Sequence, residues 1–327
     1  MPLASTWAPG TIVAGRFEIQ ELAGRGGTSE VFRARDRESD TQIALKLLSL
    51  SGPDKMSLER FLREAQLLAE LRHPNVVRYV AHGQPMDGQA FLAMEWLAGE
   101  DLGQRLRRGR LGAAESLRLA RKVAEVLVML HGRGILHRDL KPSNLFLRGG
   151  HVEQVVLLDF GIARRPPGLG PRTRTGQVVG TLQYLSPEQA RSERRLGPAT
   201  DIYSLGCVLF ECLTGEPPFH GDHPGVVLAR ILCEEAPLLG QLRPGLPAVF
   251  ESLLVRMLAK RPGDRPAGAQ EVLDALAQLE RAEALPEETA PARGPALTGG
   301  EQRLVSVILA APPEGDDAEP DPALPED

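Results

Sequence analysis

Cysteine is scarce in this chain and long apolar runs are missing, and both shortages restrict what the protein can be. Only three cysteines occur among the 327 residues, Cys207, Cys212 and Cys233, and no two of them have Cys-x-x-Cys spacing. This pattern predicts buried thiols in a reducing compartment. No apolar run approaches the length of a membrane span, about 18 residues, and no basic-then-apolar leader opens the chain. We therefore expect a cytoplasmic protein without a membrane span.

Charge is distributed unevenly along the chain. The net charge is −5, but Pro286–Asp327 alone holds ten acidic and two basic residues, or −8, which leaves about +3 for the preceding 285 residues. Because this stretch is also rich in proline and alanine, we expect a disordered C-terminal tail over 283–327. The weakly basic remainder does not favour nucleic-acid binding.

One apolar run interrupts the tail. Residues Leu304–Ala310 are rich in β-branched side chains and are typical of a strand. Three interpretations stay open: the run docks on the preceding domain, it stays unpaired, or it is the stub of a module that follows. The third would make the chain a fragment of a larger regulator.

The most informative motif is the run His137-Arg138-Asp139-Leu140-Lys141-Pro142-Ser143-Asn144, followed fifteen residues after Asn144 by Asp159-Phe160-Gly161. Transfer of a γ-phosphoryl group needs a carboxylate to orient the attacking hydroxyl, a cation near the transferred charge, and oxygen ligands for Mg²⁺. The candidates are Asp139 as the carboxylate, Lys141 as the cation, and Asn144 with Asp159 as metal ligands. The pattern resembles the bacterial eukaryotic-type (Hanks-type) Ser/Thr protein kinases.

The rest of the kinase motif set appears in order along the chain. Residues Ala23–Val31 resemble the glycine-rich loop, with Ser29 where the family usually has its third glycine. Glycines in such a loop let backbone N–H groups approach phosphate oxygens. Lys46 lies in an alternating, strand-like run, and Glu64 lies beside an apolar stripe at helical spacing in 58–71. The resemblance implies a Lys46–Glu64 salt bridge that holds the lysine on the α- and β-phosphates.

The resemblance also implies which residues surround the nucleotide. The hinge between two lobes matches Glu95–Gly99, where backbone groups near Glu95 and Leu97 would bind the adenine edge. For Asp101 two interpretations stay open, since its carboxylate could bind ribose hydroxyls or cap the helix that begins at Leu102. The expected nucleotide contacts are Leu22, Gly24, Gly26, Ser29, Val31, Ala44, Lys46, Glu95, Leu97, Asp101 and Phe146.

The activation segment, Asp159–Glu188, contains candidate regulatory acceptors. Thr173 and Thr175 lie among arginines in a Pro- and Gly-rich stretch. Kinases with an arginine beside the catalytic aspartate, as Arg138 is here, usually use it to bind a phosphate on this segment. We therefore expect phosphorylation of Thr173, Thr175 or both to order the segment through Arg138.

Four further matches concern the scaffold of the site. The resemblance implies that Thr181 bonds the catalytic loop and shapes the substrate groove. It implies that Asp201 anchors the backbone of the catalytic loop, and that Arg265 forms a buried ion pair with Glu188.

These matches predict an α+β, two-lobed protein kinase fold, with a small β-rich N-lobe that has one main helix and a larger helical C-lobe. The expected domains are an N-terminal extension at 1–15, the N-lobe at 16–94, the hinge at 95–99, the C-lobe at 100–282 and the tail at 283–327. A hydrophobic content of 42% is enough to bury a sizeable core over this span.

The predicted function is ATP- and Mg²⁺-dependent phosphorylation of protein Ser and Thr hydroxyls in bacterial signalling, autophosphorylation included, with Mn²⁺ as an alternative cation. A lysine two residues after the aspartate, Lys141, favours Ser/Thr over Tyr acceptors. Expected partners are protein substrates and a second copy of the chain for trans-autophosphorylation. The alternatives are a nucleotide-binding pseudokinase scaffold, a regulatory module of a larger regulator, and a small-molecule kinase of similar fold.

Overall fold

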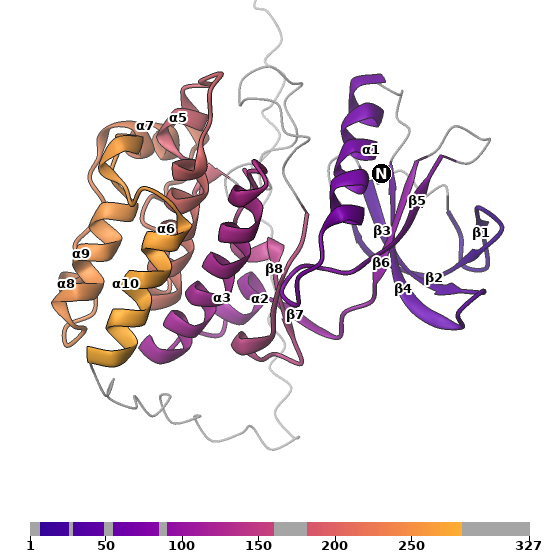
Figure 1. Ribbon diagram of the computed structural model, residues 1–327, viewed down its shortest axis with the longest axis horizontal. Coiled ribbons are helices and arrows are strands. Elements are labelled where there is room, and N and C mark those ends of the chain that lie inside the picture. The colour runs from indigo at the N-terminus through magenta and orange to yellow at the C-terminus, as the bar shows by residue number, and fades with distance from the viewer. Residues whose placement is uncertain (1–6, 26–28, 49–54, 85–89, 160–181, 283–327) are drawn as a thin grey trace, which may run out of the picture. The chain divides into compact units, whose positions relative to one another are not determined.

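The computed structural model describes residues 7–25, 29–48, 55–84, 90–159 and 182–282. The predicted tail at 283–327 and the apolar run inside it lie outside these ranges. Two parts can be followed in Figure 1: a β-sheet with one long helix, formed by the N-terminal residues, and a larger group of helices that follows in the chain.

The N-terminal sheet contains, in the described part of the chain, six antiparallel strands in the order β1-β2-β3-β4-β6-β5. In the hairpin of β2 and β3, Leu22 lies opposite Phe32 and Gly24 lies opposite Val31. The glycine-rich run therefore connects two paired strands. The strands are β1 Ile12–Val13, β2 Phe17–Arg25, β3 Ser29–Asp36, β4 Thr41–Leu48, β5 Tyr79–Gly83 and β6 Phe91–Glu95.

Alternation of side chains gives this sheet two different faces. Successive residues of a strand point to opposite sides. On β4, Ile43, Leu45 and Leu47 are at most 1% exposed and pack with Phe17 and Phe32 in one apolar cluster. The residues between them on β4 face the other side.

Helix α1, Lys55–Glu70, is the main helix of the N-terminal part and packs beside β5. It begins three residues before the predicted start at 58 and ends one residue before the predicted end. Phe61, Ala65 and Leu68 recur at three- and four-residue spacing and are buried. Glu64, next to this stripe, is only 6% exposed.

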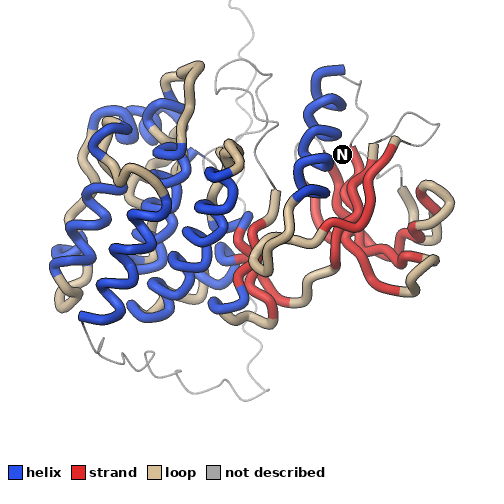
Figure 2. The backbone as a smooth tube through the Cα atoms, in the orientation of Figure 1, coloured by secondary structure: helices blue, strands red, loops and turns tan. Residues whose placement is uncertain are grey.

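The C-terminal part is mainly helical, with one small sheet near the N-terminal part (Figure 2). The sheet contains β7 Gly99–Asp101, β8 Leu145–Arg148 and β9 Val155–Leu157. Among the described residues, no helix combines the length and the apolarity needed to cross a membrane. The helices are α2 Leu102–Leu106, α3 Ala113–Gly132, α5 Pro187–Ala190, α6 Pro198–Thr214, α7 Pro224–Cys233, α8 Leu239–Leu242, α9 Ala248–Met257 and α10 Ala269–Ala282.

Helix α6 forms the centre of this part, and α3 and α9 pack against it. Its sequence sets both ends: Pro198 occupies the first turn, where the missing N–H costs nothing, and Gly215 ends the helix at a φ of +94°. Most of its side chains between the ends are buried. A helix that is apolar on nearly all sides suits a position inside a helical domain.

The prediction of three buried thiols is wrong for one of them. Cys207 and Cys212 on α6 are buried, but Cys233 is exposed. Helix α7 buries Val227 and Ile231, which are four residues apart and share one face. Cys233, two residues after Ile231, falls on the opposite side of the helix.

A half-buried carboxyl in α6, that of Glu211, predicts a pH-dependent stability. The hydroxyl of Tyr184 donates to Glu211 Oε2 at 2.7 Å, and burial raises the pKa of Glu211 from 4.5 to about 7. The folded protein therefore keeps a proton, between about pH 4.5 and 7, that the unfolded chain has lost. Over this window the free energy of unfolding should fall as pH rises, by on the order of 1–3 kcal/mol, and then level off.

Urea denaturation at pH 5, 6, 7 and 8 measures this effect in wild type and in Glu211→Gln. The difference in unfolding free energy between them should change across the window, because glutamine does not titrate. The exposed Glu59→Gln is the matched control and should follow wild type at each pH. A constant difference between wild type and Glu211→Gln would contradict the raised pKa.

Candidate active site

Lys46 lies where three segments of the chain meet. Its neighbours Leu45 and Leu47 face the apolar cluster of the sheet, so Lys46 is turned to the other side of β4. Its Nζ lies 3.1 Å from Glu64 Oε1 on α1 and 2.8 Å from Asp159 Oδ1 after β9. One ammonium group therefore joins the sheet, α1 and the segment that follows β9.

Neighbouring groups keep Lys46 and Asp159 in their charged forms. Burial alone would lower the pKa of Lys46, but Asp159 and Glu64 together raise it, so the side chain stays an ammonium. Burial would raise the pKa of Asp159, yet the charge and hydrogen bond of Lys46 bring that pKa below its usual value. The result is a cation beside an ionised carboxylate, which suits phosphate oxygens and a divalent metal.

Asp139, Lys141 and Asn144 converge just before β8. Lys141 Nζ lies 3.1 Å from Asp139 Oδ2, and Asn144 Nδ2 donates to the same oxygen at 3.1 Å and to the Asp139 carbonyl at 2.8 Å. Two donors therefore orient one carboxylate. Because the amide nitrogen of Asn144 is used in this way, its amide oxygen is the atom that can meet a cation.

Asp201, at the start of α6, fixes the backbone of this loop. Its two carboxylate oxygens accept the N–H groups of His137 at 2.9 Å and Arg138 at 2.8 Å, and His131 Nε2 lies 2.9 Å from Oδ2. Arg138 has a φ of +65°, which a non-glycine residue adopts only when its surroundings hold it. The fully buried Asp201 supplies that constraint.

Backbone contacts hold Asp159 beside Asn144. The N–H of Leu158, the residue before Asp159, donates to the Asn144 carbonyl at 2.8 Å. The Leu158 carbonyl lies 3.1 Å from His137 Nε2. The two predicted metal ligands are thus carried by chain segments that are hydrogen-bonded to each other.

Several predicted nucleotide contacts occupy the side of the sheet that carries Lys46. Residues directly opposite on paired strands share a face, and Val31 is paired with Lys46, while Ala44 is paired with Met94. The Glu95 N–H donates to the Arg78 carbonyl at 2.9 Å. The Glu95 N–H is therefore already paired within the N-terminal part, and the adenine contact of this residue stays a prediction.

For the remaining predicted nucleotide contacts, the structure gives their positions on the strands and connections. Leu22 is 42% exposed on β2, and Ser29 begins β3. Phe146 lies opposite Asp101 in the β7–β8 pair. Leu97 follows β6 in the connection to β7.

Asp101 has the capping role that was one of its two interpretations. Its Oδ1 accepts the Gln104 N–H at 2.9 Å, and its extended backbone precedes α2. This bond leaves the ribose interpretation as a proposal, because a carboxylate has further acceptor positions.

Glu188 and Arg265 form a buried, two-bond ion pair. Arg265 Nη1 and Nη2 lie 2.8 and 2.9 Å from the two carboxylate oxygens, and the exposed fractions of the two side chains are 0% and 3%. Thr200 donates a further bond to Glu188 at 2.8 Å. The pair attaches α5 to the segment before α10.

Sequence interpretation missed the contact that joins α5 to the catalytic loop. Gln189 Nε2 donates to the Arg138 carbonyl at 2.9 Å. Ser186 and Gln189 also cap α5 reciprocally, the Ser-x-x-Gln capping box. The spacing of Ser186 and Gln189 was visible in the sequence, but the bond to Arg138 was not.

Four predicted residues lie outside the described ranges: Gly26, Thr173, Thr175 and Thr181. So do Phe160 and Gly161 of the motif that begins at Asp159.

Comparison with known proteins gives the family. The model of the protein kinase domain matches residues 17–276, most of the chain. The chain belongs to the protein kinase family. The serine/threonine-protein kinase pkn3 of Myxococcus xanthus is 38% identical over 270 residues, which are 80% of this chain and 49% of pkn3. The serine/threonine-protein kinase PknH of Mycobacterium tuberculosis is 36% identical over 257 residues, 78% of this chain and 40% of PknH.

Solved structures agree with the sequence relatives. The PknI kinase domain of Mycobacterium tuberculosis has a TM-score of 0.65 and 28% identity, over 83% of this chain and 99% of that domain. The predicted two-lobed kinase fold and the resemblance to bacterial Ser/Thr kinases are thus confirmed. The chain spans half the length or less of pkn3 and PknH.

Proposed function

We propose that this chain transfers the γ-phosphoryl group of ATP to Ser and Thr hydroxyls of proteins, including its own activation segment, in the bacterial cytoplasm. The observation that carries the proposal is the pair of contacts from Lys46 to Glu64 and Asp159. Family kinases need this lysine–glutamate pair and the metal-binding aspartate in place together. Family membership supports the use of ATP with a divalent metal.

The residues present fit a nucleotide–metal group. Asp159 supplies an ionised carboxylate, and Asn144 supplies an amide oxygen whose own nitrogen is already bonded to Asp139. No group of three or more acidic, His or Cys residues that could hold a metal occurs in the described chain. Two oxygen ligands suffice for Mg²⁺, which takes its other ligands from phosphates and water and would neutralise charge on the phosphates. We propose Mg²⁺ as the physiological ion, with Mn²⁺ as a substitute.

In the proposed reaction the side chains mainly position the reacting groups and stabilise the charge on the phosphates. Asp139 accepts a hydrogen bond from the attacking hydroxyl and orients it, while Lys141, 3.1 Å from Asp139, lies near the transferred charge. Lys46, fixed by Glu64, binds the α- and β-phosphate oxygens. Because Asp201 and Asn144 hold the loop backbone and the carboxylate, little reorganisation is needed when the substrate arrives.

Two other functions remain as alternatives. A pseudokinase scaffold is disfavoured because no expected catalytic residue is missing. Lys46 bonds Glu64 and Asp159, Asn144 bonds Asp139, and the N–H of Leu158, next to Asp159, bonds the Asn144 carbonyl. A small-molecule kinase is disfavoured by Lys141 and by the relatives, which are named Ser/Thr protein kinases. We also propose domain limits at 16–94 and 100–282, the hinge between them, and trans-autophosphorylation between two copies.

Transfer of label from γ-labelled ATP to the chain and to a generic Ser/Thr protein tests the proposal. We expect label on both in Mg²⁺, its loss with excess chelator, and its recovery on adding Mg²⁺ back. Mass spectrometry should map the self-label to Thr173, Thr175 or both, and Thr173→Ala/Thr175→Ala should lose most of it. ATP binding without transfer to any acceptor would support the pseudokinase alternative.

A further inference from the structure

A cavity of about 360 Å³ shares only Glu95 with the candidate active site, and its size falls in the range of ligand sites. It is formed by the connection from α1 to β5, the last residue of β6 and the last residue of β8. The charged lining residues are Arg72, Arg78, Glu95 and Arg148. We name this cavity the arginine pocket.

The pocket holds more positive than negative charge. Three guanidinium groups line it against one carboxylate, that of Glu95. Glu95 Oε1 accepts Arg148 Nη2 at 2.6 Å and the Arg78 N–H at 2.8 Å, whereas Arg78 Nε reaches the carboxylate only at 4.0 Å. The Glu95 carboxylate is therefore paired mainly with the Arg148 guanidinium. The Arg78 side chain is 67% exposed. The lining keeps an excess of two positive charges.

Main-chain carbonyls, and not carboxylates, hold Arg72. Its Nη1 donates to the carbonyls of Ala69 and Leu71 at 3.2 and 3.1 Å. Arg133, from the end of α3, donates to the Glu70 carbonyl at 3.2 Å. Within the described ranges no carboxylate forms an ion pair with Arg72 or Arg133. These two guanidinium groups are thus oriented by the end of α1 without being neutralised.

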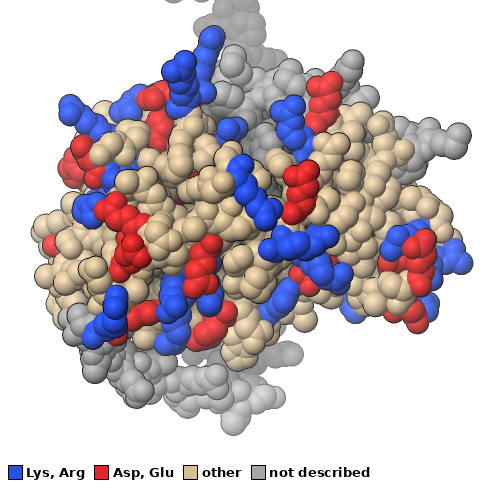
Figure 3. Space-filling model, viewed as in Figure 1, with Lys and Arg blue, Asp and Glu red and all other residues tan. Residues whose placement is uncertain are grey.

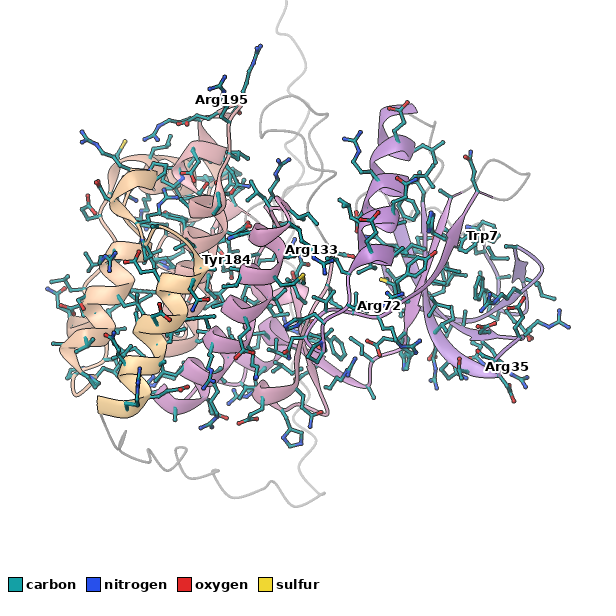
Figure 4. The ribbon with its side chains drawn as sticks, viewed as in Figure 1. Trp7, Arg35, Arg72, Arg133, Tyr184 and Arg195 are labelled. Carbon is teal, nitrogen blue, oxygen red and sulfur yellow. The ribbon has the colours of Figure 1, made fainter. Side chains whose placement is uncertain are left out.

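The figures place this charge on one face of the protein. Figure 4 labels Arg72 and Arg133 close together, between the sheet and the helical part. Lys and Arg side chains gather in the same area of the space-filling view (Figure 3). Such a concentration of positive charge raises the local density of anions and speeds their association with the protein.

The rest of the lining adds apolar surface and a neutral donor. The exposed ring of Pro74 supplies apolar surface, whereas Leu71, Val76 and Val77 line the cavity but are each only 4% exposed. His73 Nδ1 accepts the Asn75 N–H at 3.1 Å, so the proton of the neutral ring is on Nε2. Burial lowers the pKa of His73, and the positive charge of the pocket therefore comes from the arginines alone.

We propose that the arginine pocket binds an acidic peptide segment of a protein partner, in which carboxylates flank an apolar side chain. Carboxylates match the fork of donors on Arg72 and Arg78, and the apolar side chain matches the exposed ring of Pro74. A free inorganic anion would use only the first of these features. The occupant would contact the end of α1 and the hinge residue Glu95, and its binding does not depend on the proposed catalysis.

Fluorescence anisotropy with two labelled peptides tests this site. The acidic probe is a fluorescein-labelled peptide with the core Glu-Leu-Glu-Glu-Leu-Glu, and its partner has Gln in place of each Glu. We expect the acidic probe to bind the whole chain and the Gln peptide to bind at least about tenfold more weakly. Arg72→Gln/Arg78→Gln should raise the Kd for the acidic probe about tenfold or more, equivalent to about 1.4 kcal/mol.

The matched control is Arg194→Gln/Arg195→Gln, which removes the same charge from an exposed pair outside the pocket. Its Kd should stay within about twofold of wild type, and the single variant Arg78→Gln should give an intermediate value. If the control variant bound the acidic probe as weakly as the pocket variant, binding would reflect general charge attraction and not a site. If the pocket variant bound the probe as tightly as wild type, the arginine pocket would be rejected as the site. Displacement of the probe by millimolar inorganic phosphate as effectively as by unlabelled acidic peptide would overturn the peptide as occupant. Thermal unfolding of each variant establishes that it is folded.

Discussion

Asp139→Asn should lower the rate of phosphoryl transfer about 10³-fold, within the range for loss of a group that handles the substrate proton. Asparagine keeps the shape of the side chain but lacks the negative oxygen that receives the hydroxyl hydrogen. The Asp139 carboxylate is held by Lys141 and Asn144, whereas Lys46, the proposed phosphate ligand, is held by Glu64 and Asp159. KM for ATP should therefore change by less than about threefold, while kcat falls.

Initial rates with labelled ATP and a generic protein acceptor measure this split between kcat and KM. The control is Asp222→Asn, which removes an exposed carboxylate far along the chain from the catalytic loop, and it should keep wild-type rates. If Asp139→Asn retained more than a tenth of the wild-type kcat, the assigned role of Asp139 would be wrong. Equal inactivity of wild type and both variants would support the scaffold alternative instead.

Arg265→Ala should lower the free energy of unfolding by roughly 3–5 kcal/mol, the cost of leaving one partner of a buried ion pair without the other. The side chain is fully buried, bonds both oxygens of Glu188, and also donates to the carbonyls of Ala199 and Ala259 at 2.8 Å each. Removing it leaves the buried Glu188 without its cation and orphans these carbonyls. A loss of this size is a large part of the stability of an ordinary domain.

Urea denaturation followed by circular dichroism gives the free energy difference, and the soluble yield gives a second readout. The control is Arg256→Ala, which removes an exposed ion pair with Glu271 and should cost less than about 1 kcal/mol. A stable and fully active Arg265→Ala variant would contradict the structural importance of the pair. Since Glu188 lies in the first turn of α5 and Gln189 of that helix bonds the Arg138 carbonyl, the folded fraction of Arg265→Ala should also have reduced activity.

The secondary structure near the site followed from local patterns. Alternation predicted a strand around Lys46, and β4 is found at Thr41–Leu48. Helical spacing predicted the helix that carries Glu64, although α1 begins earlier than expected. These patterns succeed because strand and helix periods act between near neighbours in the sequence. The exposure of Cys233 was not predicted, because it depends on which face of α7 meets the rest of the domain.

The sequence by itself determined the types and order of the functional groups, from the glycine-rich run through Lys46 to Asp159, and their match to one family. Only the tertiary structure decided which groups meet. It brought Lys46 within 2.8 Å of Asp159, 113 residues later in the chain, and it placed Arg72, Arg78 and Arg148 around one cavity. The physical reason is that such contacts depend on how the sheet, α1 and the catalytic loop pack against each other. Periodicity within each segment carries no information about that packing. The family resemblance predicted part of it, namely the Lys46–Glu64 and Glu188–Arg265 pairs and the anchoring of the loop by Asp201, but nothing about the arginines around the cavity.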